Sequence, residues 1–217
     1  MLCQQTSGHY LALLSGNRFD MTARFIAALI AVFLCFGWTP ARAETAAKTL
    51  GTELLTRASE ARAAAADHVT NQRYMVIIDY RLHSAVPRFY LVDLRDNTAR
   101  AFLTAHGKGS DPDHDGLADT FSNTNGSKMS SLGSFVTGDT YYGRHGLSLK
   151  MHGLDPSNDR ALERAIVIHG AAYVNPGRAV LGRSWGCPAL SEKVAERIIP
   201  MIKNGVFIYA VGPPARP

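Results

Sequence analysis

The sequence predicts a mainly β protein with few helices, preceded by an N-terminal helix. Short apolar runs rich in β-branched residues recur along the chain, and turn-forming residues separate them. Only two stretches show the spacing of an amphipathic helix. The 217 residues, of which 46% are hydrophobic and 19% charged, suffice for one sizeable folded domain with an N-terminal appendage and argue against wholesale disorder.

The N-terminus has the pattern of a signal peptide. A basic start at residues 21–24 precedes an apolar run over 25–38 and a small-x-small triplet that ends at Ala43. We expect residues 1–43 to be the signal peptide. Met21 is an alternative start of translation, in which case residues 1–20 would be an extension assigned by mistake. The apolar run is short for a membrane span, and no later run approaches about 18 apolar residues. We therefore expect a secreted protein of the periplasm or cell envelope, with no membrane span in the mature chain.

The mature chain is predicted to divide into a helical segment at 44–70 and a β-rich domain at 71–217. From Glu44 to His68 the chain is rich in Ala, Glu, Lys, Arg and Leu. Its larger apolar side chains recur every three or four positions, at Leu50, Leu54, Leu55 and Ala58. This pattern predicts an amphipathic helix that packs on the domain, and a partner-binding helix is the alternative.

The domain is predicted to contain a series of short strands and one helix. The expected strands are 74–80, 88–94, 99–104, 133–137, 147–151, 164–169 and 206–211. The first three follow one another closely enough to form an antiparallel meander. The helix is expected from Ser191 to Lys203, where Val194, Ile198, Ile199 and Ile202 share one side and Gly205 follows the end.

A long polar segment, from Ala105 to Ser131, separates the meander from the later strands. Loops of this length in compact domains are often functional. Within it, Asp111, Asp113 and Asp115 match the opening of a calcium-binding loop, but a serine takes the twelfth position, where such loops carry a bidentate Glu. We expect a carboxylate-rich turn there, with a weak calcium site as the alternative.

The charge of the chain favours an anionic partner. The net charge is +5 and the isoelectric point about 9.2, which fits a cell-wall polymer or a membrane surface. The basic residues are scattered and not interleaved with aromatic residues, so we do not expect a nucleic-acid binder. The histidines lack a short H-x-x-x-H spacing, which argues against a zinc peptidase.

Cys187 is the candidate nucleophile. Cys3 and Cys35 lie within the predicted signal peptide, so Cys187 is the only cysteine of the mature chain and has no partner for an intramolecular disulfide. A solitary thiol in an oxidising compartment is a liability unless it is buried or used. This reasoning favours a catalytic role.

His169 is the candidate base. An apolar run predicts a buried strand that ends at His169, and the 18-residue step to Cys187 lets the loop fold back toward the imidazole. The ring could take the thiol proton, while the carbonyl of Gly170 could fix its tautomer. The backbone N–H groups of Gly186 and Cys187 could stabilise an oxyanion. In the alternative reading, Cys187 is a small buried hydrophobic residue and His169 a hydrogen-bonded strand end.

These residues resemble the signature of the L,D-transpeptidase catalytic domain family, the cysteine enzymes of bacterial peptidoglycan. The resemblance lies in His169-Gly170 and in Ser184-Trp185-Gly186-Cys187. In the frequent family form a histidine stands at the position of Trp185, and an arginine follows two residues after the cysteine. The run from Gly182 to Ala189 is closer to a divergent branch with the form Gly-Arg-Ser-x-Gly-Cys-Pro-Ala.

The resemblance spans Tyr74 to Gly212 and implies a catalytic domain built as a β-sandwich or open barrel. It implies that Cys187 attacks a tetrapeptide stem, that D-alanine leaves, and that an amine or water resolves the thioester. His169 carries over as the base, Gly170 as its orienter, and Gly186 with Cys187 as the oxyanion donors. The mechanism needs no metal or other cofactor.

The stem must also be held. Because the usual arginine is missing, Arg183 is the candidate partner for the carboxylates of the stem, and bracing the loop is the alternative. Ser184 and Trp185 belong to the same motif. Further candidates for the donor groove are Tyr142, His106, Ser131 and His152, each with a structural role as the alternative.

We therefore expect a secreted peptidoglycan L,D-transpeptidase whose partners are peptidoglycan stem peptides. One alternative gives the acyl group to water, as an L,D-carboxypeptidase or crosslink hydrolase. The other is a non-catalytic cell-wall-binding protein with a buried Cys187. Thiol labelling distinguishes this last alternative from the enzymes, because a catalytic thiolate should react rapidly near neutral pH and a buried structural thiol should not.

Overall fold

A computed structural model describes residues 44–214, so the predicted signal peptide lies outside the described residues. The described residues belong to one compact unit. Its helices are α2 (Ala46–Leu50), α3 (Thr52–Ala64), η1 (Ala66–His68) and α4 (Glu192–Ile202). Its strands are β1 (Glu44–Thr45), β2 (Tyr74–Asp79), β3 (Phe89–Asp93), β4 (Thr98–Phe102), β5 (Gly133–Gly143), β6 (Gly146–Gly153), β7 (Val167–Gly170), β8 (Ala189–Leu190) and β9 (Phe207–Val211). The predicted mainly β class is therefore confirmed.

The strands form one mixed sheet in the order β1-β4-β3-β2-β9-β5-β6-β7-β8. The predicted meander is confirmed, because β2 pairs with β3 and β3 with β4 in antiparallel register. The last strand, β9, enters the centre of the sheet, parallel to β2 and antiparallel to β5. It thereby joins the meander to the strands that carry the candidate site.

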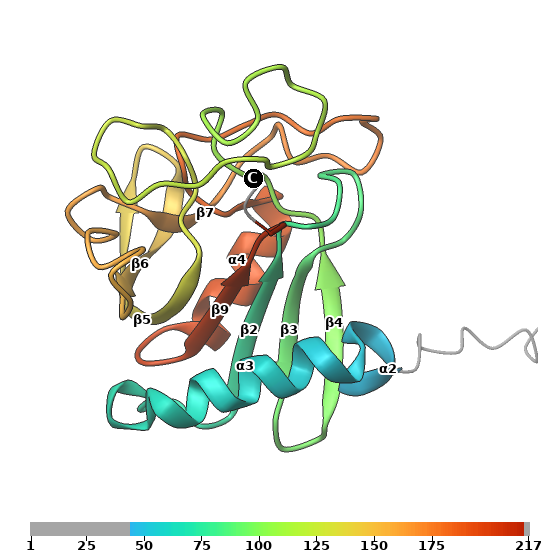
Figure 1. Cartoon of the computed structure of the whole chain (residues 1–217), viewed down its shortest axis with the longest axis vertical. Coiled ribbons are helices and arrows are strands. Elements are labelled where there is room, and N and C mark those ends of the chain that lie inside the picture. The colour runs from blue at the N-terminus through green and yellow to red at the C-terminus, as the bar shows by residue number, and fades with distance from the viewer. Residues whose placement is uncertain (1–43, 215–217) are drawn as a thin grey trace, which may run out of the picture. The chain divides into compact units, whose positions relative to one another are not determined.

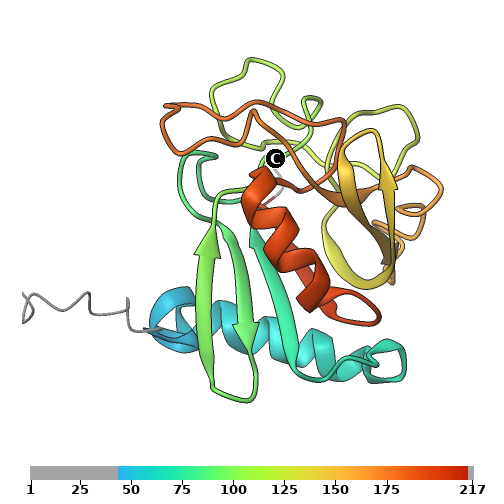
Figure 2. The ribbon, with the colours of Figure 1, turned by 180° about the vertical axis from the view of Figure 1, so that it is seen from behind.

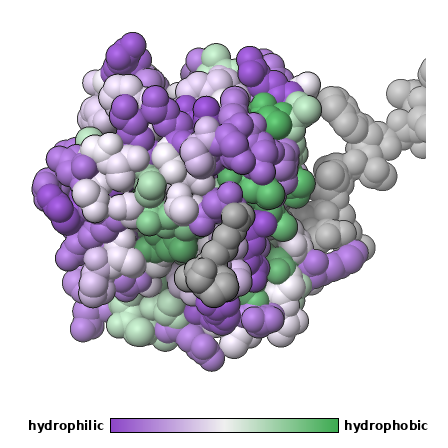
Figure 3. Space-filling view, turned by 45° about the horizontal axis from the view of Figure 1, so that its top comes forward, coloured by the Kyte–Doolittle hydropathy of each residue, from purple (hydrophilic) through white to green (hydrophobic). Residues whose placement is uncertain are grey.

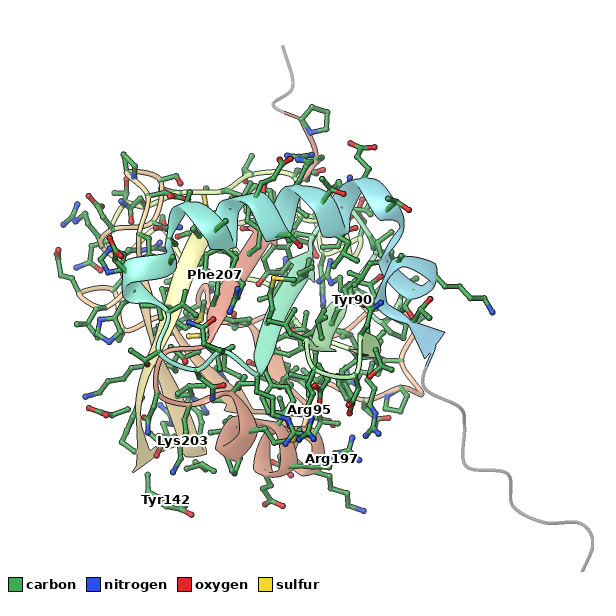
Figure 4. All side chains as sticks on the ribbon, turned by 90° about the horizontal axis from the view of Figure 1, so that it is seen from below. Tyr90, Arg95, Tyr142, Arg197, Lys203 and Phe207 are labelled. Atoms are coloured by element: carbon green, nitrogen blue, oxygen red, sulfur yellow. The ribbon has the colours of Figure 1, made fainter. Side chains whose placement is uncertain are left out.

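Two helical layers cover opposite faces of the central strands, with α3 on one face and α4 on the other (Figures 1 and 2). Successive side chains of β2 point to opposite faces of the sheet, so they contribute to two separate halves of the core. Met75 and Ile77 pack with α3, whereas Val76 and Ile78 pack with α4. Figure 4 shows Phe207 and Tyr90, two members of the α3 layer, beneath that helix.

The N-terminal helix differs from its prediction in continuity. The expected single helix from Glu44 to His68 is divided into β1, α2, α3 and η1, with Gly51 between the two α-helices. Gly51 has a φ of 80°, a conformation that glycine adopts readily and that interrupts a helix. Leu54 and Ala58 are buried against the sheet. The predicted packing of this segment on the domain is therefore confirmed.

The second half of the sheet departs from the predicted strand limits at two places. The hairpin of β5 and β6 is longer than expected, because β5 continues to Gly143 through a register shift between Thr137 and Thr140. The strand β7 begins only at Val167 instead of Arg164. Ala165 causes this late start, because its φ of 55° is incompatible with extended backbone.

Two long loops, residues 105–131 and 171–188, gather at one end of the sheet (Figure 1). The view onto this end shows a mainly hydrophilic surface with smaller hydrophobic areas (Figure 3). Isolated bridges join the loops to each other and to β8, at Gly107 with Ser184 and at Ala105 with Ala189. The loop that precedes Cys187 is therefore held by the long polar segment.

Within residues 44–214, no helix has both the length and the apolar character that crossing a membrane requires.

Candidate active site

Cys187 lies in the loop before β8, next to the start of β7. Its partly buried Sγ accepts a hydrogen bond from the Val167 N–H at 3.5 Å and donates to the Ala165 carbonyl at 3.6 Å. Val167 and His169 belong to the same short strand and, being two residues apart, point to the same face of it. The thiol is thus hydrogen-bonded to the strand that carries the imidazole. Among the described residues, no hydrogen bond joins the two side chains directly.

The tautomer of His169 follows from its hydrogen bond. Its Nδ1 lies 2.9 Å from the carbonyl oxygen of Gly170, the contact that the sequence led us to expect. Because a carbonyl oxygen only accepts, Nδ1 carries the proton, and Nε2 of the neutral ring keeps a free lone pair. Gly170 itself allows α4 to approach, because a Cβ there would lie 3.0 Å from Cα of Glu192.

Electrostatics keep both groups neutral at rest. Burial lowers the pKa of His169, and a charge on His145 lowers it further, while the hydrogen bond that Nδ1–H donates to the Gly170 carbonyl raises it. Burial raises the pKa of the Cys187 thiol, and the Val167 N–H and Arg164 offset this only in part. The resting pair is therefore a thiol beside a neutral base. The directions of both pKa shifts disfavour the preformed thiolate on which the expectation of rapid labelling near neutral pH depends.

Close backbone contacts fix the position of the cysteine loop. Gly186 has a φ of 124°, and a Cβ there would lie 2.7 Å from the carbonyl oxygen of Met129. A Cβ on Gly107 would lie 2.8 Å from Cα of Gly186. Ser130 ties these segments together, because its hydroxyl accepts from the Gly107 N–H and donates to the Gly186 carbonyl, each at 3.0 Å.

Of the two predicted oxyanion donors, one is already engaged. The Gly186 N–H donates to Oγ of Ser184 at 3.0 Å, so it is committed within the loop. The N–H of Cys187 has no acceptor in the part of the chain that the structure describes. The available donor is therefore Cys187, and we assign Gly186 to shaping the turn.

A buried network of charged and polar side chains supports the loop that carries Cys187. Arg88 donates to Nδ1 of His106 at 2.7 Å, and Nε2–H of His106 donates to Asp111 at 3.0 Å. Burial, followed by the Arg88 charge, lowers the pKa of His106 to about 4, so the ring is neutral. The backbone of His106 accepts from the N–H of Ser184. His106 is 1% exposed, and this burial corrects its placement in the donor groove.

Asp111 also explains the calcium-like pattern. Oxygen atoms of Asp111, Asp113 and Asp115 lie within 4.8 Å of one another. However, both oxygens of Asp111 already accept hydrogen bonds, from His106 and from the backbone N–H groups of Asp115 and Gly116. The structure therefore fits the expected carboxylate-rich turn.

Three further candidates are engaged inside the protein. The hydroxyl of Ser184 binds within its own loop and that of Ser131 bonds to the backbone of Ser122. The guanidinium of Arg183 donates to the carbonyl oxygen of Asp111, as in its alternative reading as a brace. Each of these three side chains therefore holds loop segments together through at least one hydrogen bond.

The remaining candidates differ in exposure and place. Trp185 is 71% exposed beside the cysteine, and the ammonium of Lys128 lies 4.9 Å from the centre of its ring. Tyr142 is 83% exposed near the tip of the β5–β6 hairpin, where it points away from the ribbon (Figure 4). His152 lies on β6 against Gly138, and the structure gives it no contact with Cys187 or His169. Only Trp185 is close to the nucleophile.

The sequence reasoning missed Arg164 and His145. Arg164 binds the loop carbonyls of Ser122 and Met129, and its charge opposes the rise in the pKa of Cys187. His145, at the hairpin tip, stacks on His169 with 4.4 Å between ring centres. Arg164 is the first residue of the predicted strand 164–169, so its position was a usable signal, whereas the position of His145 in a turn was not.

The sequence model of the L,D-transpeptidase catalytic domain family matches residues 46–211. The chain belongs to that family. Members of the family are cysteine-dependent enzymes of the cell wall, and Cys187 is the one cysteine among the described residues. The match begins at the first residue of α2, so the N-terminal helices belong to the matched region.

Solved structures of L,D-transpeptidases and of a cell shape determining protein are similar to this family member. An enzyme from Mycobacterium smegmatis is 13% identical, with a TM-score of 0.41 over 64% of this chain and 59% of that chain. L,D-transpeptidase 3 from Mycobacterium tuberculosis is 11% identical, with a TM-score of 0.43 over 64% and 61%. The helical cell shape determining protein Pgp2 from Campylobacter jejuni is 15% identical, with a TM-score of 0.43 over 67% and 49%.

This chain therefore spans three fifths or less of the M. smegmatis and C. jejuni structures. Among curated proteins no match was found.

Proposed function

We propose that this chain is a secreted L,D-transpeptidase that forms an acyl-enzyme on Cys187 with a peptidoglycan tetrapeptide stem and passes the acyl group to an amine. The observation that carries the proposal is the fixed tautomer of His169. The Gly170 carbonyl holds the proton on Nδ1, and this leaves a basic Nε2 on the strand that contacts the thiol.

In the first half of the reaction, Sγ of Cys187 attacks the carbonyl carbon of the stem, and the thiol proton moves to Nε2 of His169. The bond to the leaving amine then breaks. The proton on Nε2 goes to that amine, D-alanine leaves, and a thioester remains. In the second half, an acceptor amine attacks the thioester and gives its proton to Nε2, the C–S bond breaks, and the sulfur recovers the proton.

Two features of the site support this order of events. The Nδ1–H bond to Gly170 persists while Nε2 is protonated, so it stabilises the imidazolium that forms in each half. The N–H of Cys187 has no acceptor among residues 44–214 and would donate to the oxygen of a tetrahedral intermediate formed on its own sulfur. The lowered pKa of His169 and the raised pKa of Cys187 both disfavour a preformed ion pair, which fits proton transfer as the sulfur attacks.

Secretion and location are part of the proposal. The pattern that ends at Ala43 would release a mature chain beginning at Glu44 into the periplasm or cell envelope. Peptidoglycan stem peptides are then the available substrates. N-terminal sequencing of protein recovered from the envelope fraction would return Glu44 as the first residue, whereas retention of the apolar run would contradict this assignment.

The activity is tested by product analysis with residues 44–217 and purified disaccharide-tetrapeptide. We expect the wild type to release D-alanine and to form a crosslinked dimer, and Cys187→Ala to do neither. Release of D-alanine with only tripeptide as product would assign a hydrolase that uses the same acyl-enzyme. Folded wild-type protein that gives no product, with Cys187 inert to thiol reagents even at high pH, would leave the wall-binding alternative.

A further inference from the structure

Arg164 connects the segment before β7 with the long polar loop. Its guanidinium donates to two backbone carbonyls of that loop, those of Ser122 at 2.7 Å and Met129 at 2.6 Å. It also donates to the hydroxyl groups of Ser127 and Ser131. All four acceptors belong to the same loop, so one partly buried side chain holds this loop against the start of the strand.

The residue that follows Arg164 contacts the nucleophile. Sγ of Cys187 donates to the Ala165 carbonyl at 3.6 Å and accepts from the Val167 N–H at 3.5 Å. Ala165 has a φ of 55°, a conformation that residues other than glycine keep only where their surroundings enforce it. The hydrogen bonds of Arg164 provide this restraint on the preceding side, so they help to fix the two polar partners of the sulfur.

The loop that Arg164 holds also contacts the turn of Cys187. The Met129 carbonyl, which accepts from Arg164, packs against Gly186, because a Cβ on Gly186 would lie 2.7 Å from that oxygen. The next residue, Ser130, donates to the Gly186 carbonyl at 3.0 Å. Arg164 therefore fixes a segment on each side of the thiol.

The positive charge of Arg164 has no carboxylate partner. All four of its acceptors are neutral, and it forms no ion pair with any residue in 44–214. By contrast, Arg160, four residues earlier, pairs with Glu163 at 2.8 Å. A charge that is partly removed from water costs free energy unless an opposite charge compensates it.

The charge of Arg164 and the sulfur of Cys187 act on each other. Burial raises the pKa of the Cys187 thiol, while the Val167 N–H and the positive charge of Arg164 lower it. Similarly, burial lowers the pKa of Arg164, and a thiolate on Cys187 raises it. A negative sulfur would thus compensate the guanidinium.

We propose that Arg164 is a positioning residue for Cys187, and that its guanidinium stabilises the negative charge that develops on the sulfur during attack. Its hydrogen-bond partners all belong to the protein, so it acts through Cys187 and not on the stem. This inference rests on the proposed function, because only an acylating cysteine must develop this charge during a reaction.

The role of Arg164 in the reaction follows from the movement of charge. When the thiol proton passes to Nε2 of His169, the sulfur becomes negative, and the guanidinium stabilises it. An electron pair of the sulfur then forms the C–S bond, and the negative charge passes to the oxygen of the tetrahedral intermediate. Loss of Arg164 should therefore slow acylation without weakening the binding of the stem.

The first experiment measures thiolate formation without substrate. The rate at which iodoacetamide alkylates Cys187 is followed between pH 6 and pH 10 in the wild type and in Arg164→Gln, Arg164→Met and Arg164→Lys. Two neutral variants are used so that the comparison does not depend on how well one replacement folds, which circular dichroism checks. The control Arg178→Gln removes an exposed arginine of the loop that carries Cys187.

We expect the pH–rate curves of both neutral variants to lie about one pH unit above that of the wild type, because a positive charge that favours the thiolate is lost. Arg164→Lys keeps the charge and should shift the curve by less than half as much, and Arg178→Gln should not shift it. Unshifted curves in the neutral variants would overturn the inference. So would a shift in Arg164→Lys or Arg178→Gln as large as that in Arg164→Gln.

The second experiment separates positioning of the nucleophile from binding of the substrate. For D-alanine release from disaccharide-tetrapeptide, we expect Arg164→Gln to lower kcat about tenfold and to change KM by less than about twofold, with partial recovery of kcat in Arg164→Lys. A raised KM with unchanged kcat would contradict the inference, because Arg164 would then bind the stem. If the wild type formed no acyl-enzyme, the proposed function would fail, and the alkylation series would still decide the role of Arg164.

Discussion

The neutral resting state of Cys187 sets how this thiol reacts. Burial raises its pKa, so the thiol form persists to higher pH than in an exposed cysteine. We expect the rate of alkylation by iodoacetamide to remain low between pH 5 and 7 and to rise steadily through pH 9, because only the thiolate attacks. A pH series followed by mass spectrometry measures this. A plateau of rapid labelling near pH 6 would indicate a preformed ion pair with His169 instead.

Single residues also show how far sequence reasoning can go. Cys187 and His169 stood out because a lone cysteine and a histidine at a strand end are rare and chemically specific. Ser184, His106 and Arg183 were equally polar, yet the structure uses them to hold loops. Sequence does not separate these cases, because the direction and burial of a side chain depend on loops from distant parts of the chain.

The buried pair of His106 and Asp111 makes a prediction about acid stability. The folded-state pKa of His106 is about 4, below its ordinary value of 6.5. As pH falls from 6.5 toward 4, the unfolded chain binds a proton that the folded protein does not, so the free energy of unfolding decreases, by at most about 3 kcal/mol. We expect His106→Gln to reduce this loss, measured as urea unfolding at pH 7 and pH 5.

The matched control for this network is His68→Gln, at an exposed position at the end of η1. It should retain the wild-type difference between the two pH values. If the free energy of unfolding of His106→Gln decreased between pH 7 and pH 5 as much as that of the wild type, other groups would be its cause.

The contact between the two long loops gives a prediction about glycine. A Cβ on Gly107 would overlap Gly186, so we expect Gly107→Ala to displace the cysteine loop and to lower the free energy of unfolding by about 1–3 kcal/mol. Gly177→Ala is the control, because its Cβ would meet only Oδ1 of Asn175 at 3.5 Å. Chemical denaturation of both variants measures the effect. Equal stability of the two would contradict the close packing of these loops.

The elements themselves were partly predictable. Strands β2, β3 and β4 and the helix α4 follow regular apolar patterns, and their predicted limits differ from the observed ones by two residues or fewer. The end of β5 was missed because the register shift after Thr137 breaks the alternation of its residues. The stacking of His145 on His169 was missed for a related reason, since this contact depends on the length of the β5–β6 hairpin.

For the molecule as a whole, the N-terminal helix is part of the folded unit. Leu54 is 5% exposed and packs in the layer beneath α3. We expect Leu54→Ala to lower the free energy of unfolding by about 2–5 kcal/mol, because it leaves a cavity. The control Leu162→Ala, at a position that is 47% exposed, should change it by less than about 0.5 kcal/mol. Similar small losses in both variants would mean that α3 is dispensable to the core.

The order of the sheet could not be predicted from sequence. The C-terminal strand β9 pairs with β2 and β5, which are far from it along the chain. Local patterns identify a strand but not its neighbours, because pairing depends on contacts between distant segments. The same limit hid the hydrogen bonds of Arg164, whose acceptors come from the loop 105–131.

The central claim is that a peptidoglycan stem becomes covalently attached to Cys187. Intact-protein mass spectrometry of residues 44–217, quenched soon after mixing with disaccharide-tetrapeptide, tests it most directly. The account predicts a mass increase equal to the donor less D-alanine in the wild type, its location on Cys187 in peptide mapping, and no increase in Cys187→Ala. An adduct that persists in Cys187→Ala, or D-alanine release by that variant at the wild-type rate, would contradict the account.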